Sequence, residues 1–261
     1  MPPTTSKPIH SAPFSGFHPQ PVRISPLAID YTRPQKASAP ICTDCRKIPA
    51  WKRVLDIVGV VLAAPVLIPF AAVIALIIKA VSRGPVLFKQ KRIGFQGHPF
   101  SCLKFRTMVV NADTQFHAGH LNRLMSANCP MTKLDARDPR LIPAGRLLRS
   151  LGLDELPQLI NVLRGDMSLV GPRPCLPYEY EKYLPRHRRR CETLPGLTGL
   201  WQVNGKNETT FEEMISLDIE YAERKSLWLD LKIIALTIPV ILGQACELRT
   251  NQKAGSSNGA V

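Results

Sequence analysis

Residues 153–174 have the sequence LDELPQLINVLRGDMSLVGPRP, which indicates a helix, a short strand and a stiff loop in succession. The apolar residues that follow the acidic pair Asp154 and Glu155 are spaced for one face of a helix: Leu156, Leu159, Ile160 and Leu163. Pro157 is tolerated in the first turn of such a helix, and Gly165 is a stop signal. The block therefore predicts a helix whose amino-terminal end carries two carboxylates.

The acidic pair has two interpretations. An aspartate at the start of a helix is most often an N-cap, and Glu155 would then be a companion charge. The same place offers free backbone amides and the positive end of the helix dipole, which keep a carboxylate ionised and favour a nearby phosphate. An ionised carboxylate is also a competent nucleophile towards phosphorus. Adjacent carboxylates do not suit a glycosidase, whose two acids lie on opposite sides of a sugar.

The loop Gly171–Pro174 follows a short apolar strand, Ser168–Val170, and its two prolines fix the backbone around Arg173. A rigidly presented guanidinium suits bidentate contact with a phosphate. A stiff loop with a solvent-facing arginine is the alternative. Arg149, which precedes the acidic pair, is interpreted first as structural support that binds the two carboxylates or a neighbouring helix.

Upstream, residues 57–78 contain no charged side chain and are about long enough to cross a bilayer as a straight helix. Pro65 and Pro69 each remove a backbone donor and clash with the preceding turn, so we expect a strong bend near residues 64–69. Basic residues flank both ends of the segment: Lys52, Arg53, Lys79 and Arg83. The positive-inside tendency then favours both ends on the cytoplasmic side. These features predict a re-entrant helix hairpin, with an ordinary kinked transmembrane helix as the alternative.

Between these two blocks the pattern changes to short strands. Residues 86–93 and 99–105 flank Gly94–Gly97, where glycines can supply the positive φ that a hairpin turn needs. Lys104 and Arg106 alternate with apolar residues near the end of the second strand. They either line a solvated strand face or meet the phosphates of a substrate.

Residues 195–207 have the sequence PGLTGLWQVNGKN, which is dense in glycine. Gln202, Asn204 and Lys206 suit a loop that contacts a substrate, and a turn-rich connector with Trp201 in the core is the alternative. After it, residues 211–224 have the pattern of an amphipathic helix. Residues 227–246 are apolar, but Pro239 interrupts an uncharged core that is too short to span a bilayer. We expect a helix that lies on the membrane, with Trp228 and Lys232 at headgroup level.

Composition limits the classes of protein that fit. The first fifty residues hold ten of the 24 prolines and show no apolar period, so residues 1–50 are predicted to be a disordered tail that stays in the cytoplasm. A formal charge of +14 suits anionic lipid or phosphorylated substrates. There is no zinc-finger or RNA-binding signature, so no nucleic-acid partner is predicted. Cys42 and Cys45 have the spacing of half a zinc site, but the second half is missing.

Together these blocks resemble the bacterial sugar transferases, the monotopic phosphoglycosyl transferases that load a sugar 1-phosphate onto polyprenyl phosphate. The resemblance runs from about Trp51 to Cys246. It includes the hairpin motif FKQ-x-R-x-G, the motif KFRTM at Lys104–Met108, and the PG-x-TG-x-x-QV-x-G-[RK] element with Lys206 where arginine is common. One departure is Ala64, which stands where the family often has a serine before the proline of the membrane break.

The resemblance implies roles for individual residues. Asp154 is expected to attack the β-phosphate of a UDP-sugar, and Glu155 to help by positioning a metal or by transferring a proton. Mg²⁺ is the expected cofactor, held by Asp154 and Glu155. The residues expected to bind substrate or its phosphates are Lys104, Arg106, Arg173, Gln202, Asn204 and Lys206.

The sequence thus predicts an α/β monotopic membrane enzyme with a re-entrant helix hairpin, a short β-hairpin and interfacial amphipathic helices. The catalytic domain is expected at residues 51–247, with the membrane helix at 51–82 and a flexible tail at 248–261. We expect it in the bacterial inner membrane, with its active site on the cytoplasmic face. UDP-sugar, polyprenyl phosphate and membrane lipid are the expected partners, and the interpretation allows a homo-oligomer or downstream glycosyltransferases. The rival hypothesis is a basic membrane-bound scaffold without catalysis.

Overall fold

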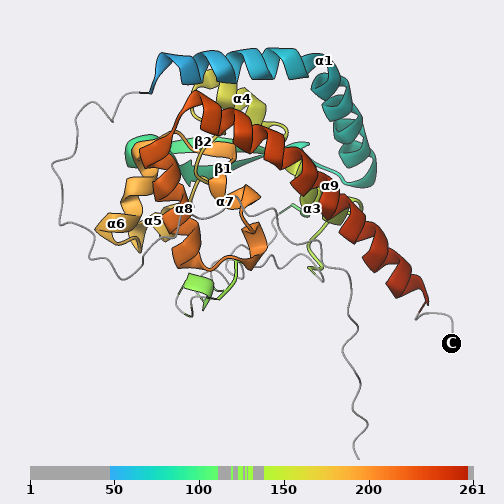
Figure 1. Ribbon diagram of the computed structural model, residues 1–261. Helices are drawn as coiled ribbons and strands as arrows, with labels where there is room; N and C mark the ends of the chain where they lie inside the picture. The colour runs from blue at the N-terminus through green and yellow to red at the C-terminus, as the bar shows by residue number, and fades with distance from the viewer. Residues whose placement is uncertain are drawn as a thin grey trace, which may run out of the picture.

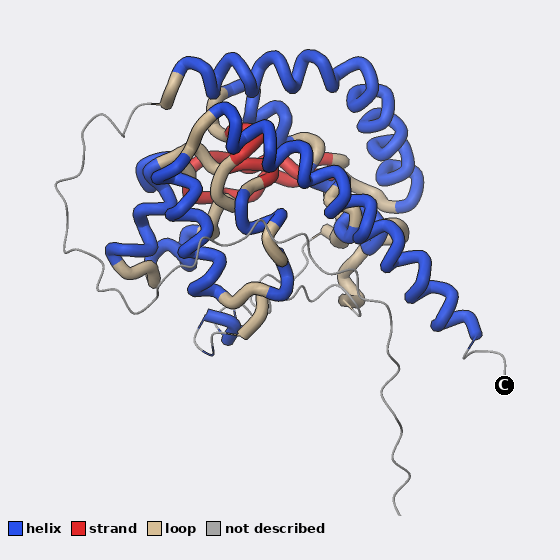
Figure 2. Tube along the Cα trace, in the orientation of Figure 1, coloured by secondary structure: helices blue, strands red, loops and turns tan. Residues whose placement is uncertain are grey.

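The computed structural model describes residues 48–110, parts of 119–131, and 138–257, with backbone only at 207 and 245–257. Residues 1–47, with Cys42 and Cys45, and residues 258–261 lie outside the described residues. The described chain mixes helices with two small sheets, as predicted. Figure 2 shows the strands in the middle of the molecule with helices around them.

The longest element is α1, Ala50–Val81, which contains both Pro65 and Pro69. Figure 1 shows α1 running across the top of the molecule and then bending downward along one side. Most of its large apolar side chains are exposed, among them Val54, Val61, Leu62, Val66, Ile68, Val73 and Leu76. Its buried residues lie near both ends: Lys52, Asp56, Val60, Ile74 and Ile78. The helix therefore packs on the folded body with both halves and exposes an apolar surface between and beside them.

The predicted hairpin is confirmed. It consists of β1, Leu87–Ile93, and β2, Pro99–Phe105, which pair antiparallel with Leu87 opposite Phe105. The turn contains the 3₁₀ helix η2, Phe95–Gly97, in which Gln96 (φ 53°) and Gly97 (φ 79°) have positive φ. Gly94 has φ −119°, so only one of the two glycines supplies the expected conformation and Gln96 supplies the other.

The second sheet has two parallel strands, β3 (Ser168–Val170) and β4 (Gly196–Thr198). Ser168 lies opposite Gly196, and Val170 lies opposite Thr198. The sequence predicted β3, but β4 falls in the block that was predicted to be a loop. This pairing joins the two glycine- and proline-rich blocks of the chain, because the loop Gly171–Pro174 follows β3 directly.

The helix predicted from Asp154 is shorter than expected. The acidic pair lies in a separate 3₁₀ turn, η4 (Leu153–Glu155), and the α-helix α4 spans Gln158–Arg164. Pro157 occupies the N-cap position of α4, so Asp154 is not the cap of that helix. Gly165 ends α4 with φ 90°, as predicted. Ile160 and Leu163 are exposed while Asn161 and Val162 are buried, so the apolar spacing did not identify the buried face of this helix.

Before η4 lies the short helix α3, Gly145–Ser150, and after β3 come α5 (Pro177–Glu181), α6 (Pro185–Arg188), η5 (Arg189–Glu192), α7 (Leu200–Val203) and η6 (Lys206–Glu208). Helix α8 spans Phe211–Arg224, as predicted, and starts with a capping box between Thr210 and Glu213. Its buried face includes Met214, Ile215 and Tyr221. These short elements surround the two sheets.

The last helix, α9, spans Leu227–Ser257 and is continuous through Pro239, so the expected interruption there is wrong. It also includes residues 248–257, beyond the expected boundary of the domain. Its first half packs on the core through Ile233 and exposes Trp228, Ile238, Ile241 and Leu242. Two segments, Ala50–Val81 and Leu227–Gln244, are long and apolar enough to cross a membrane.

Candidate active site

The acidic pair lies on η4, and its two members have different surroundings. Gly152, with φ 70°, sets the start of the turn, a conformation that favours glycine. Asp154 is 8% exposed. The side chain of Glu155 is 38% exposed and forms an ion pair with Lys104, whose Nζ lies 2.8 Å from Oε1. One carboxylate is therefore sheltered, and its neighbour faces a cation.

Lys104 comes from β2, and it connects the hairpin to the acidic pair. The contact spans 51 positions of sequence, so only the fold brings the two charges together. Arg106 lies two residues further along the chain and has a different position. Its guanidinium donates to the carbonyls of Arg83 (2.6 Å) and Ser82 (2.9 Å), just past the carboxyl end of α1. Arg106 therefore binds the backbone that follows α1. Its expected role in phosphate binding stays a prediction.

Several charged groups converge on β2 beside the acidic pair. The Cys102 thiol is buried, and burial raises its pKa, while the cations Lys104, Arg92 and Arg173 lower it and Glu155 raises it further. Burial likewise lowers the pKa of Arg92, and the neighbouring Arg173 cation lowers it again. Arg92 is thus within electrostatic reach of Arg173 and Glu155, and Glu155 is paired directly with Lys104. Cations near a partly exposed carboxylate suit the binding of a diphosphate.

The loop Gly171–Pro174 is anchored through its carbonyl groups. Pro172 O accepts from the amide of Gly196 (2.8 Å). Arg173 O accepts from Arg190 Nη2 (3.0 Å), and Pro174 O accepts from Arg92 Nη1 (2.9 Å). The two prolines predicted a stiff loop. In the structure, the loop is also held by hydrogen bonds from residues that are distant in the sequence.

The Arg173 side chain emerges from this anchored backbone. It is 31% exposed, and its Nη1 lies 3.8 Å from Oε1 of the buried Glu179. This Nη1 is buried and faces the Glu179 carboxylate, with no hydrogen-bond partner among the described residues. A partly exposed guanidinium on an anchored loop suits an incoming phosphate.

Residues 186–190, four arginines and His187, lie on α6 and η5. Arg190 is buried and binds Asp218 and Tyr183, in addition to the carbonyl of Arg173. Sequence reasoning missed Arg190, Arg92 and Glu179 as neighbours of the site. Neither their spacing nor their flanking residues distinguished them from the other charged residues, because their roles depend on burial.

The block of residues 195–207 reaches the site mainly through its backbone. A Cβ at Gly196 would lie 2.1 Å from the amide nitrogen of Gly171, so the two glycine segments touch with no room for a side chain. The side-chain amide of Asn204 donates to Leu200 O (2.8 Å), and that of Gln202 to Leu197 O (3.4 Å), both within the block. The buried Oε1 of Gln202 has no partner among the described residues.

Lys206 and Arg149 both lie near helix α3. The Gln244 amide of α9, oriented to suit both neighbours, accepts from Lys206 Nζ (3.2 Å) and donates to Ser150 O (3.3 Å). Arg149 lies in α3, which contacts η4. The structure therefore places Lys206 near the end of α3, while direct contact of Gln202, Asn204 or Lys206 with a substrate stays a prediction.

The described residues contain no group of three His, Cys, Asp or Glu side chains that could hold a metal ion. Mg²⁺ differs from zinc in this respect, since it commonly uses one or two carboxylates together with water and substrate phosphate. The two carboxylates of η4 fit that pattern, because the Glu155 side chain is partly exposed.

Residues 48–244 match the family described as bacterial sugar transferase, and this match spans α1, both sheets and the acidic pair. The chain belongs to this family. As a bacterial sugar transferase, it has the acidic pair and the anchored arginine loop within the matched region.

Curated relatives agree with this assignment. The UDP-glucose:undecaprenyl-phosphate glucose-1-phosphate transferase of Caulobacter vibrioides is 41% identical over 199 residues, which cover 73% of this chain and 69% of the relative. The exopolysaccharide production protein ExoY of Sinorhizobium fredii is 38% identical, covering 73% of this chain and 84% of ExoY. The galactosyl transferase CpsE of Streptococcus agalactiae is 40% identical, but the match spans only 42% of its length.

Proposed function

We propose that this bacterial sugar transferase moves a sugar 1-phosphate from a UDP-sugar to polyprenyl phosphate, giving polyprenyl diphosphate sugar and UMP. This would be the first membrane step of exopolysaccharide, capsule or related glycan synthesis. The observation that carries the proposal is the ion pair between Lys104 and Glu155, directly beside the buried Asp154 on η4. The names of the relatives supply the sugar phosphate and the undecaprenyl phosphate carrier.

Asp154 is the nucleophile of the first half-reaction. Its carboxylate attacks the β-phosphorus of the UDP-sugar, and the bond between that phosphorus and the bridging oxygen breaks. UMP leaves with the electron pair, and a phosphoglycosyl-aspartate remains. In the second half-reaction an oxygen of the carrier phosphate attacks the same phosphorus and releases Asp154.

The cations act on the charge of the diphosphate. Lys104 and Arg173 would bind its oxygens, and the anchoring of the loop through the Arg173 carbonyl would limit the entropic cost of positioning Arg173. Glu155 and Asp154 would hold Mg²⁺, which when bound neutralises negative charge on the diphosphate. Glu155 is otherwise suited to accept a proton from the attacking carrier phosphate.

The packing of α1 supports a re-entrant, monotopic arrangement. Val60 in its first half packs with Cys102, Val162 and Met167. Ile74 and Ile78 in its second half pack with Phe105, Ile142 and Leu148. Both halves of the helix thus rest on one folded body, which favours a position of its two ends on the same side of a bilayer. The exposed apolar residues of α1 and α9 would enter the inner membrane from the cytoplasmic face.

The rival hypothesis is a scaffold without catalysis. It explains the apolar helices and the positive charge, but it gives no reason for cations and carboxylates to gather around η4. The proposal is tested by incubating the detergent-solubilised protein with UDP-sugars, undecaprenyl phosphate and Mg²⁺. Wild type should form a labelled lipid and release UMP, and Asp154→Asn should do neither. A folded wild-type protein that turns over none of the nucleotide sugars would favour the scaffold.

A further inference from the structure

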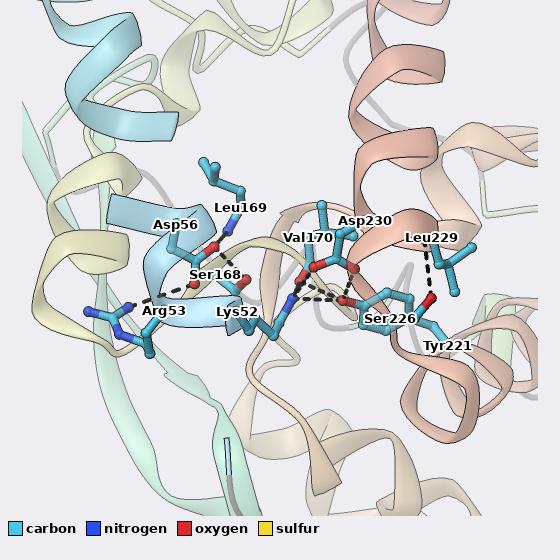
Figure 3. Close-up of polar contacts among 10 residues, drawn as sticks. All are labelled: Lys52, Arg53, Asp56, Ser168, Leu169, Val170, Tyr221, Ser226, Leu229 and Asp230. Carbon is cyan, nitrogen blue, oxygen red and sulfur yellow. Dashed lines mark hydrogen bonds and ion pairs between the residues drawn. The ribbon is translucent and has the colours of Figure 1, made fainter. Parts of the chain in front are cut away.

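Lys52, in the first turn of α1, is fully buried, and its ammonium is surrounded by acceptors (Figure 3). Nζ donates to Asp230 Oδ2 (2.6 Å), to the hydroxyl of Tyr221 (2.8 Å) and to the carbonyl of Val170 (2.8 Å). These partners come from α9, α8 and β3. The three donors of the ammonium are therefore matched by three acceptors on three different elements.

A buried ion pair is weak evidence for stability by itself, because desolvation offsets most of the attraction between the charges. Apolar residues of similar size would hold α1, α8 and α9 together about as well. The contact that apolar residues could not replace is the third one, to the carbonyl of Val170. The single hydroxyl proton of Tyr221 is shared between Asp230 Oδ1 (2.7 Å) and the same carbonyl (3.1 Å). The network thus ends on one backbone oxygen.

Asp56, one turn further along α1, binds the same strand. Its Oδ1 accepts from the hydroxyl of Ser168 and from the amide of Leu169, each at 2.8 Å (Figure 3). All three residues of β3 are therefore bound by side chains of α1, and β4 pairs with the strand as well. The first turns of the membrane helix act as a lateral support for β3.

β3 leads directly into the loop that carries Arg173. The carbonyls of Pro172, Arg173 and Pro174 are each held by a donor, so the loop has little freedom to absorb a shift of Val170. We propose that Lys52 is a positioning residue: by holding the carbonyl of Val170, it sets where Arg173 meets the substrate phosphate. The packing of α1 on the folded body would then determine the position of Arg173. The inference rests on the proposed function for the identity of the substrate.

The test is a double-mutant cycle between the buried pair and Arg173. Lys52→Met/Asp230→Leu removes both charges at once and so leaves no buried charge unpaired. We expect it to fold with a melting temperature close to that of wild type, while its kcat/KM and its affinity for UDP fall by about ten-fold. In the Arg173→Lys background the same double change should cost less than about three-fold, because the positioned group is already altered.

Arg224→Met is the matched control. It removes a cation of α8, the helix that carries Tyr221, but Arg224 pairs with Glu220 of the same helix (2.7 Å) rather than with β3. Any cost of this change should be the same in the wild-type background and in the Arg173→Lys background. A second variant, Tyr221→Phe, removes the hydroxyl that lies among Lys52, Asp230 and the Val170 carbonyl without removing a charge, and should show coupling to Arg173 of the same sign.

Full activity and UDP affinity in the double variant, or an equal loss in both Arg173 backgrounds, would make the network purely structural. If the double variant fails to fold, the Tyr221→Phe cycle decides in the same way. UDP binding by calorimetry needs no turnover. A wild-type protein that binds UDP but releases UMP from no UDP-sugar would defeat the proposed function, while the cycle in binding would still test Lys52.

Discussion

Lys104 Nζ lies 2.8 Å from Oε1 of Glu155, so a cation of the hairpin is paired with the more exposed member of the acidic pair. Asp154, the adjacent residue, is buried to a greater degree. Two neighbouring carboxylates thus have separate environments, and separate roles follow. Glu155 is placed to exchange contacts with incoming ions, and Asp154 is proposed as the attacking group.

The first prediction concerns this ion pair. Lys104→Met should lower kcat/KM for the UDP-sugar by about ten-fold or more, because a cation that binds the diphosphate is lost. Lys91→Met is the control, since Lys91 is an exposed lysine of the paired strand β1 and is not part of the charged group at β2. Steady-state UMP release measures both. Equal activity of the two variants would mean that Lys104 does not bind the diphosphate and serves only the structure.

The second prediction concerns Arg173 and the metal. Arg173→Lys keeps the charge but loses the planar fork, so activity should fall about ten-fold, equal to roughly 1.4 kcal/mol of transition-state stabilisation. EDTA should abolish turnover, and added Mg²⁺ should restore it. Near-normal activity of Arg173→Lys would mean that the guanidinium does not bind phosphate through two donors. Turnover that persists in EDTA would remove Mg²⁺ from the mechanism.

Sequence patterns predicted the local elements that depend on short-range signals. The hairpin, β3, α8 and the stop at Gly165 follow from alternation, capping and glycine, and the structure has them. Pro157 was expected in the first turn of one helix that starts at the acidic pair. Instead it is the N-cap of α4, and the acidic pair lies in the separate turn η4. Pro239 did not stop α9, since the helix continues on both sides of it.

Long-range partners could not be predicted in the same way. The pairing of β3 with β4 and the burial of Lys52 depend on which distant segments meet. A basic residue that flanks an apolar segment, as Lys52 does, has the same appearance in the sequence whether it is exposed at a surface or paired with a buried aspartate. The exposed face of α4 was also missed, because apolar spacing cannot distinguish a side that packs on the core from an apolar side that is exposed.

The third prediction concerns topology. Both halves of α1 pack on one body, so the segments before and after it should share the cytoplasmic side. Single cysteines near Ser15 and Ser256, in a cysteine-free background, should both resist an impermeant thiol reagent in intact cells. Both should react after the cells are permeabilised. Labelling of only the first position in intact cells would mean a spanning helix.

The fourth prediction concerns the contact between the two glycine segments. A Cβ at Gly196 would lie 2.1 Å from the Gly171 nitrogen, which is backbone and cannot move aside cheaply. Gly196→Ala should therefore lower stability by about 1–3 kcal/mol through overpacking and should displace the arginine loop. Gly243→Ala is the control, because no atom of the described residues lies within 4 Å of its added Cβ. Thermal melts and UMP release should separate the two variants. An unchanged Gly196→Ala protein would mean that the segments can part without cost.

The fifth prediction tests the nucleophile and the order of the steps together. If Asp154 attacks the β-phosphate, UMP must leave before the lipid carrier reacts, and the kinetics should be ping-pong. Wild type incubated with labelled UDP-sugar, without polyprenyl phosphate, should retain sugar 1-phosphate on the peptide that contains Asp154. Asp154→Asn should still bind UDP but form no adduct, because the amide is not a competent nucleophile. Glu155→Gln should be impaired, and adduct that accumulates in it would assign Glu155 to the second half-reaction. An active enzyme with sequential kinetics and no adduct would instead transfer the phosphosugar directly, with Asp154 as a metal ligand.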